Sequence, residues 1–310
     1  MDNRKMESKK MTAANLGLLF MAIVWGFGFI VTKDSIDIVT PMQIMVIRFA
    51  IGAVGLFVVF MPRVLKSSKD TIKSGAILGV LVFVSYTLQT IGIKYTSASN
   101  NAFLTTIYVI IMPWLVFFTT RQKPGKVTII ASVVTFIGVG LMSIQDEFSI
   151  NYGDILTVLG ALVFGLHLLR VSIYSRNYDP IALATIQLAV CAVLSIISTL
   201  IFDPPMSLDL FKSSAKWAIL YLGIVNTFLT FLLQFICQKY TTPISASLIM
   251  SLESVFAAVF SYLFLDERLA IQAIIGAALI LISIFIAQLD ILKGVKADER
   301  ALYKTELDIN

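Results

Sequence analysis

The sequence predicts an all-α integral membrane protein of ten transmembrane helices, arranged as two inverted-topology repeats of five, with both termini in the cytoplasm. Composition, the spacing of apolar runs and an internal repeat predict this class. Of the 310 residues, 58% are hydrophobic and 14% are charged, whereas a soluble domain carries about 25% charged residues. The mean hydropathy is +0.89. These values exclude an ordinary water-soluble enzyme, and the net charge of +5 indicates membrane topology rather than a nucleic-acid-binding surface.

Ten apolar runs have the length of about 20 residues that a helix needs to cross the bilayer. In chain order they are Met11–Thr32, Pro41–Met61, Ile72–Ile93, Ala98–Thr120, Lys126–Ile144, Gly153–Ser175, Pro180–Phe202, Ser214–Gln238, Ile244–Leu265 and Leu269–Leu289. The first run is too long for a signal peptide and no small-residue cleavage pattern follows it, so we expect it to be retained. Cys191 and Cys237 fall inside runs, which favours buried packing over a disulfide or a metal site.

Lysine and arginine residues are distributed unequally between the two sides that these spans define. With the N-terminus inside, eighteen fall on the cytoplasmic side and five on the other, while Arg48 lies within the second run. Because cytoplasmic loops carry the excess of basic residues, the distribution predicts cytoplasmic termini in a multi-pass protein of the plasma (inner) membrane. The charged tail, residues 293–310, is expected to be cytoplasmic, and no function is assigned to it.

The two halves of the chain match at fixed spacing. Residues 88–96 (LQTIGIKYT) and 233–241 (LQFICQKYT) share the pattern L-Q-x-I-x-x-K-Y-T. A second constant offset pairs Trp25-Gly26 with Phe164-Gly165 and Pro41 with Pro180. We therefore predict a first repeat over residues 1–145 and a second over residues 146–292. Since five spans is an odd number, the second repeat enters the membrane upside down, the arrangement that supports alternating access around a midplane site.

One stretch of the second half carries a resemblance to a known family. Residues 246–258 (ASLIMSLESVFAA) are followed by LDERL at 265–269, and the first two spans contain Trp25-Gly26 and Arg48-Phe49. Together with the ten spans and the repeat, this pattern resembles the EamA-type members of the drug/metabolite transporter (DMT) superfamily. The resemblance implies secondary transport or facilitated export of small organic metabolites, such as amino acids, amines and related solutes. The family usually has proline after the glutamate of the ninth helix, whereas this chain has Ser254, so the implied kink lacks its proline.

Ionisable side chains inside the apolar runs need a reason, because each Arg, Lys or Asp costs about 2.5 to 3.5 kcal/mol to insert. Glu253 lies roughly 14 Å into its run at 1.5 Å per residue, near the bilayer midplane. It is either a proton-coupling or cation-binding carboxylate or a hydrogen-bonded group in helix packing. Arg48 lies roughly 10 Å from the external side. Three interpretations of Arg48 stay open: snorkelling, a pair with Glu253, and capture of a substrate carboxylate.

The remaining candidates for substrate binding are aromatic and neutral polar residues inside the runs, namely Trp25, Tyr86, Gln89, Tyr108, His167, Asn226 and Gln234. The aromatic residues lie away from the interfacial belt, and they either line a cavity or pack against neighbours. The single histidine either bonds the substrate or relays protons, or it is structural. The amides either bind the solute or hold helices together.

A transporter or facilitator fits these features better than other classes do. The sequence has no G-x-x-x-x-G-K-[ST] phosphate loop for a primary pump. An intramembrane enzyme would need paired acids, a metal cluster or a nucleophile with its base, so we expect no enzyme, no cofactor and no metal. A lipid scramblase or flippase is the alternative. The expected partners are a small-molecule solute and membrane lipids, with protons as an optional coupling ion and a homodimer as an open option.

Overall fold

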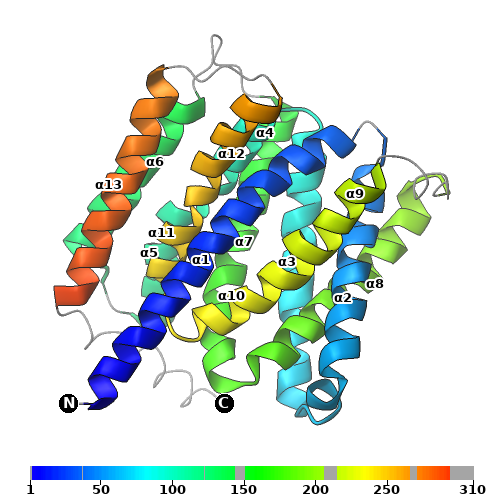
Figure 1. The fold of residues 1–310 in the computed structure, drawn as a ribbon, viewed down its shortest axis with the longest axis horizontal. Coiled ribbons are helices and arrows are strands. Elements are labelled where there is room, and N and C mark those ends of the chain that lie inside the picture. Colours follow the sequence, from blue (N-terminus) through cyan, green and yellow to red (C-terminus); the bar gives the residue numbers. More distant parts are fainter. Residues whose placement is uncertain are drawn as a thin grey trace.

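The computed structural model describes residues 2–36, 38–121, 123–143, 151–205, 215–265 and 271–293. Within these ranges the chain forms helices and no strand (Figure 1). The elements are α1 (Asp2–Ser35), α2 (Pro41–Leu65), α3 (Lys69–Ile93), α4 (Ala98–Thr105), α5 (Tyr108–Thr120), α6 (Lys126–Ser143), α7 (Tyr152–Asn177), α8 (Pro180–Phe202), α9 (Ala215–Leu220), the π-helix η2 (Tyr221–Leu229), α10 (Thr230–Gln238), α11 (Pro243–Met250), α12 (Leu252–Phe264) and α13 (Ile271–Lys293). We name the end where α1 begins the N-terminal face and the other end the opposite face.

Eight helical segments are long and apolar enough to cross a membrane, and they coincide with eight of the predicted runs. They are Lys9–Ser35, Pro41–Leu65, Lys69–Ile93, Ala98–Thr120, Tyr152–Asn177, Pro180–Phe202, Lys216–Gln238 and Pro243–Phe264. α6 and α13 contain the shorter apolar stretches Lys126–Gly138 and Ile274–Ile284, and these two helices pack along each other (Figure 1). The protein is therefore a multi-pass helical membrane protein. The count of ten spans and the cytoplasmic position of the termini remain predictions.

Capping residues fix the ends of α2 and α8, which pack along each other. Thr40 caps α2 by accepting a backbone hydrogen bond, and Asp179 caps α8 in the same way; proline occupies the first turn of both helices. Each cap also contacts the far end of the other helix. Thr40 donates a hydrogen bond to Asp203, at the end of α8, and Arg63, near the end of α2, forms an ion pair with Asp179 at 3.1 Å. The two helices are thus tied together at both faces.

The predicted fourth and ninth spans are each divided into two helices. The first break, at Thr106 and the next residue, separates α4 from α5, and the second, at Ser251, separates α11 from α12. Pro113 lies inside α5 without ending it. At both breaks a side-chain hydroxyl donates to the carbonyl three residues earlier, a local bond that competes with the helix. The ninth span is therefore interrupted even though Ser254 stands where the family usually has proline.

The predicted eighth span also departs from a regular α-helix. It runs through α9, the π-helix η2 and α10 without a gap. π-helical turns are rare and frequently occur at functional sites, because the wider turn re-aims the side chains of one helix face. Asn226 lies within η2 and is buried.

Close packing of α1 on α12 places Glu253 beside the first helix. The α11–α12 pair presents a face of small buried residues, Ser247, Ser251, Ser254, Ala258 and Ser261. Gly26 of α1 meets α12 so closely that an added Cβ would lie 2.7 Å from Phe256 Cβ and 2.9 Å from the Glu253 carbonyl oxygen. Only glycine permits this approach. This contact fixes α1 against α12 beside Glu253.

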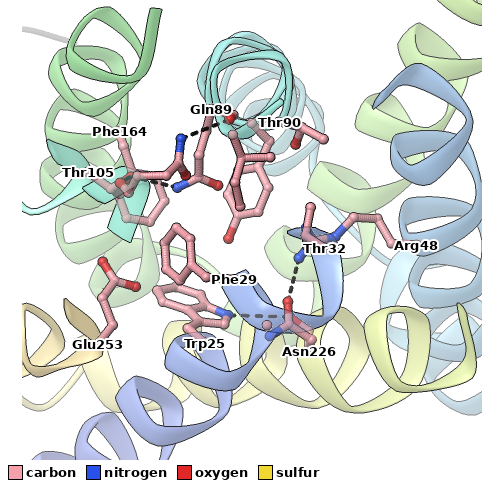
Figure 2. A pocket seen from close by; sticks show the side chains of 14 residues that line it. Trp25, Phe29, Thr32, Arg48, Gln89, Thr90, Thr105, Phe164, Asn226 and Glu253 are labelled. Carbon is pink, nitrogen blue, oxygen red and sulfur yellow. Dashed lines mark hydrogen bonds between the residues drawn. The ribbon is translucent and has the colours of Figure 1, made fainter. Parts of the chain in front are cut away.

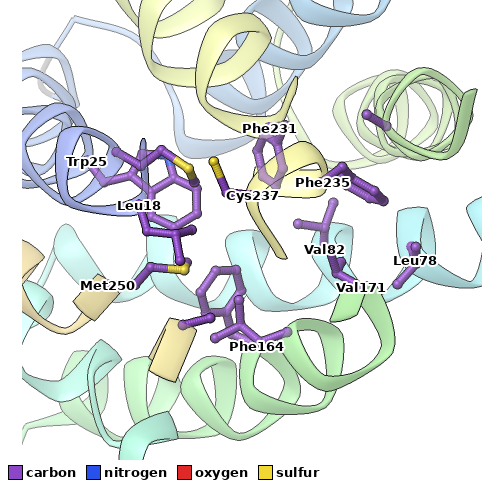
Figure 3. Close-up of a cluster of buried hydrophobic side chains, with 14 of the residues drawn as sticks. Leu18, Trp25, Leu78, Val82, Phe164, Val171, Phe231, Phe235, Cys237 and Met250 are labelled. Carbon is purple, nitrogen blue, oxygen red and sulfur yellow. The ribbon is translucent and has the colours of Figure 1, made fainter. Parts of the chain in front are cut away.

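A large apolar cluster packs between the helices (Figure 3), and members from α3, α7 and α10 lie in the halves of these helices nearer the N-terminal face. Its members include Leu18, Leu78, Val171, Phe235 and Met250, which come from five different helices and are buried. These buried side chains fill the space between the helices, so the part of the chain that the structure describes is closed toward this face. The open space lies on the other side of the cluster.

Candidate functional site

A pocket lies among the helices between the apolar cluster and the opposite face (Figure 2). It is lined by Trp25, Gly28, Phe29, Thr32, Arg48, Tyr86, Gln89, Thr90, Ile93, Asn101, Thr105, Phe164, Asn226 and Glu253. These residues come from α1 to α4, α7, η2 and α12, so both halves of the chain contribute to one site.

Arg48 brings a positive charge into the pocket. Its side chain is only 4% exposed, its Nε donates to Thr227 Oγ1 at 3.0 Å, and its Nη2 donates to Asn226 Oδ1 at 2.6 Å. The guanidinium also lies 4.8 Å from the ring centroid of Tyr86, within cation–π range. In the described part of the chain it forms no ion pair. Arg48 therefore neither snorkels outward nor pairs with Glu253, and its charge is held in place without being neutralised.

Asn226, in η2, forms hydrogen bonds with several other groups at the pocket. Its Nδ2 donates to the Val24 carbonyl at 3.0 Å, and its own carbonyl accepts from Trp25 Nε1 at 3.3 Å. The indole N–H also donates to Thr230 Oγ1 at 3.0 Å. Because the Asn226 side-chain oxygen accepts from Arg48, Asn226 contacts both the indole and the guanidinium. Gly28 makes this possible, since a Cβ at that position would overlap the Asn226 amide.

Glu253 supplies an acidic group on the other side of the pocket. It is 2% exposed, and Figure 2 shows it and Arg48 on opposite sides of the pocket. Its Oε1 accepts a hydrogen bond from the Tyr108 hydroxyl at 3.2 Å. Glu253 and Tyr108 follow the two helix breaks, so the interruptions of the fourth and ninth spans bring these side chains together. We call the site bipolar, because a guanidinium and a carboxyl group face a common space.

Hydrogen bonds fix the neutral polar groups near α3 and α4. Gln89 Nε2 donates to Thr105 Oγ1 at 2.9 Å, and Asn101 Nδ2 donates to Thr157 Oγ1 at 2.7 Å and to the Gln89 carbonyl at 3.2 Å. Gln89 is half-buried and its oxygen faces the pocket region (Figure 2). Amide and hydroxyl groups on this wall could therefore hydrogen-bond a polar solute.

Aromatic rings form the boundary between the pocket and the apolar cluster. The rings of Trp25 and Phe164 have centroids 5.9 Å apart, and those of Tyr86 and Phe231 are 5.8 Å apart. Tyr86 also contacts Phe164 at 6.1 Å. These edge and tilted contacts are the arrangements that aromatic pairs favour. The rings give the pocket an apolar floor at the level where access from the N-terminal face is closed.

The structure places the predicted residues in two groups. Trp25, Arg48, Tyr86, Gln89, Asn226 and Glu253 all line the pocket. Tyr108 is fully buried behind Glu253, and His167 and Gln234 are fully buried in α7 and α10. The roles of all nine remain predictions. Cys191 and Cys237 are buried free thiols, and among the residues that the structure describes no three His, Cys, Asp or Glu side chains are grouped to hold a metal.

Sequence reasoning misses several lining residues. Thr32, Thr90 and Thr105 are threonines in apolar helices, where the hydroxyl commonly bonds to the preceding turn, so they carry no distinct signal. Phe164 had a usable signal, because it is the counterpart of Trp25 in the internal match.

Comparison with known proteins gives a consistent result. The sequence profile of the EamA-like transporter family matches residues 12–144 and again residues 151–289. An uncharacterized transporter of Archaeoglobus fulgidus is 32% identical over 287 residues, which cover 91% of this chain and 88% of that protein. The uncharacterized transporter YoaV of Bacillus subtilis is 24% identical, with 89% and 96% covered. A protein crystal structure matches with a TM-score of 0.74 at 16% identity, covering 90% of this chain and 97% of the other; this likeness concerns the fold alone.

Proposed function

Because the chain belongs to the EamA-like transporter family, and is thus a membrane transporter, we propose that it is a secondary transporter or facilitator of small organic metabolites. The solutes are amino acids, amines or related molecules, the direction is export, and the location is the plasma (inner) membrane. The single observation that carries the solute class is the bipolar pocket, in which Arg48 and Glu253 are 4% and 2% exposed and form no ion pair with each other.

The charges of the pocket indicate how a solute would be held. A buried guanidinium binds a carboxylate by charge-assisted hydrogen bonds, and a buried carboxylate attracts an ammonium group. Trp25, Tyr86 and Phe164 offer ring faces and edges for the apolar part of the solute. A molecule with a negative and a positive group at its two ends therefore satisfies both charges, which water alone satisfies less well in a low-dielectric site.

Transport requires that the site open to the two sides in turn. We infer that the chain consists of repeats 1–145 and 146–292 and that exchange of their conformations provides alternating access. Two observations support this inference: the family profile matches each half once, and α4 and α5 are broken in the same register as α11 and α12. Glu253, which follows the second break, is the proposed coupling residue, with protons as the coupling ion.

Flux measurements in proteoliposomes test the proposal. A mixed panel of radiolabelled amino acids and amines would be assayed for uptake and counterflow, with and without a proton gradient, in the parent chain and Glu253→Gln. We expect saturable flux that the gradient concentrates in the parent and that ignores the gradient in the variant. Asp70→Asn, at an exposed carboxyl group in the first turn of α3, serves as the matched control and should keep the gradient response. Lipid redistribution without saturable solute flux would contradict the proposal and favour a scramblase.

A further inference from the structure

A second group of polar residues occupies positions equivalent to pocket residues in the internal match, but these residues are fully buried. The numbering offsets that align the two halves of the chain relate three pocket residues to three others: Gln89 to Gln234, Arg48 to Gln187 and Gly28 to His167. The first member of each pair lines the pocket. The second members are fully buried, in α10, α8 and α7. In each pair of equivalent positions, the residue of the first half therefore lines the pocket and the residue of the second half is enclosed by packed helices.

The buried counterparts contain polar atoms that lack partners. His167 Nε2 donates to Gln187 Oε1 at 2.7 Å. Within the described ranges, however, His167 Nδ1, Gln187 Nε2 and both side-chain amide atoms of Gln234 have no hydrogen-bond partner. Proteins pair nearly all of their buried polar groups, because an unpaired group loses its bonds to water without replacement. Three such residues in one region call for a state in which these atoms are satisfied.

These residues belong to one region rather than three separate ones. Gln234 lies on α10 between Phe231 and Gln238, one turn from each. The Phe231 ring contacts the His167 ring with centroids 6.4 Å apart, and Gln238 Nε2 donates to Ser172 Oγ at 3.2 Å. The face of α10 that carries Gln234 therefore packs against α7 at the level of His167. Phe231 and Phe235 of the same helix belong to the apolar cluster.

We propose that His167, Gln187 and Gln234 line a second polar pocket, which opens toward the N-terminal face when the observed pocket closes and which receives the same solute. The proposal rests on the proposed transport function. In the open second pocket, solute or water would satisfy the atoms that are unpartnered now. Its lining also differs in chemistry, because an amide, Gln187, stands where the first pocket has the Arg48 guanidinium. A carboxylate would therefore be bound more weakly there than beside the Arg48 guanidinium.

Cysteine accessibility from each side of the membrane tests this proposal. Cys191 and Cys237 would be replaced by serine, and single cysteines would be introduced as Gln89→Cys, Gln234→Cys and Gln187→Cys. Ala131→Cys is the matched control, because Ala131 is buried in α6 and belongs to neither polar group. A membrane-impermeant sulfonated maleimide would be added to sealed vesicles of both orientations. Elution on size exclusion would confirm folding of each variant.

We expect Gln89→Cys to react from the opposite face and Gln234→Cys from the N-terminal face, each at least tenfold faster than Ala131→Cys. If Gln234→Cys fails to fold, Gln187→Cys carries the same expectation. Reaction of Gln89→Cys while Gln234→Cys and Gln187→Cys are as slow as the control would overturn the second pocket, and so would reaction of these two from the opposite face alone. Solute flux is measured separately. Labelling from the N-terminal face without flux of any solute would leave the second pocket standing and refute the proposed function instead.

Discussion

The two halves of the protein hold equivalent residues in opposite environments. Gln89 is half-buried at the pocket and bonded to Thr105, whereas Gln234, its counterpart, is fully buried and its amide has no partner among the described residues. Arg48 lines the pocket, whereas its counterpart Gln187 is enclosed in packed helices. Residue type alone therefore does not decide which polar group lines a pathway. The side on which the apolar cluster closes the molecule decides it.

Residues between the halves behave differently, because they contact their own counterparts. Trp25 contacts Phe164 and Tyr86 contacts Phe231, and each pair consists of equivalent positions in the internal match. Tyr108 and Glu253 are also equivalent and share a hydrogen bond. A residue can meet its counterpart only near an axis that relates the two halves. In the proposed alternating-access cycle these contacts serve both access states, whereas the off-axis residues serve one.

The largest expected effect comes from giving a pocket residue of the first half the residue type of its buried counterpart in the second half. Arg48→Gln places in the first half the residue that the second half has at Gln187. Loss of the guanidinium removes charge-assisted bonds of about 1.5 to 3 kcal/mol, so we expect kcat/KM for a carboxylate-bearing solute to fall about 10- to 100-fold. Uptake kinetics in proteoliposomes measure this. Arg63→Gln is the control, because Arg63 is 53% exposed in its ion pair with Asp179 and such pairs contribute little. Equal losses in both variants would contradict a role for Arg48 in binding.

A smaller effect is expected where α1 approaches the π-helix. In Gly28→Ala the new Cβ would overlap the Asn226 amide and displace the group that holds Arg48 and Trp25. Overpacking of this kind costs about 1 to 3 kcal/mol, so we expect KM to rise about tenfold with little change in expression. Gly140→Ala is the control, because nothing lies within 4 Å of a Cβ at that position. Unchanged kinetics in Gly28→Ala would mean that the Asn226 position is not needed for binding.

The sequence predicts most of the fold because length, hydropathy and caps are local signals. The run predicted for Pro180–Phe202 has the bounds of α8, since Asp179 and the following proline define its start. The breaks at Thr106 and Ser251 and the π-helix were not predicted. They depend on hydroxyl bonds to the backbone and on packing against α1 and α7, and serine or threonine in a membrane helix more often leaves the helix intact.

The charged part of the site is also predictable, because charge deep in an apolar run is rare. This criterion identifies Arg48 and Glu253, and both line the pocket. The same criterion does not identify the amides that line the pocket, because this depends on which end of the molecule is closed. Gln89 and Gln234 have equivalent sequence surroundings, and only the arrangement of helices separates them.

A still smaller effect is expected at the hydrogen bond between Tyr108 and Glu253, which joins the two halves of the chain. Tyr108→Phe removes the hydrogen bond to Glu253 without changing the volume of the side chain. The bond contributes about 1 kcal/mol, so we expect the response of transport to a proton gradient to fall about fivefold while solute affinity stays the same. Counterflow, which needs no gradient, measures affinity separately. Tyr152→Phe, at a tyrosine that is 62% exposed, should change neither property. A fall in affinity alone would place Tyr108 with solute binding rather than coupling.

The smallest expected effects are those of leucine at the equivalent positions Gln89 and Gln234. The two substitutions should change the free energy of unfolding in opposite directions. Gln89→Leu removes the bond to Thr105 Oγ1 and should lower the free energy of unfolding by about 1 kcal/mol. Gln234→Leu removes an amide with no partner in the described chain and inserts an apolar side chain of similar size. Because the buried amide no longer has to be desolvated, we expect this variant to gain about 1 kcal/mol, seen as a thermal midpoint a few degrees higher in detergent. The same variant should turn over more slowly, since the observed conformation is favoured over the one in which the Gln234 side chain would be exposed. A loss of stability in both variants would mean that the Gln234 amide is bonded in the observed state, and the asymmetry between the halves would then reduce to the difference between Arg48 and Gln187.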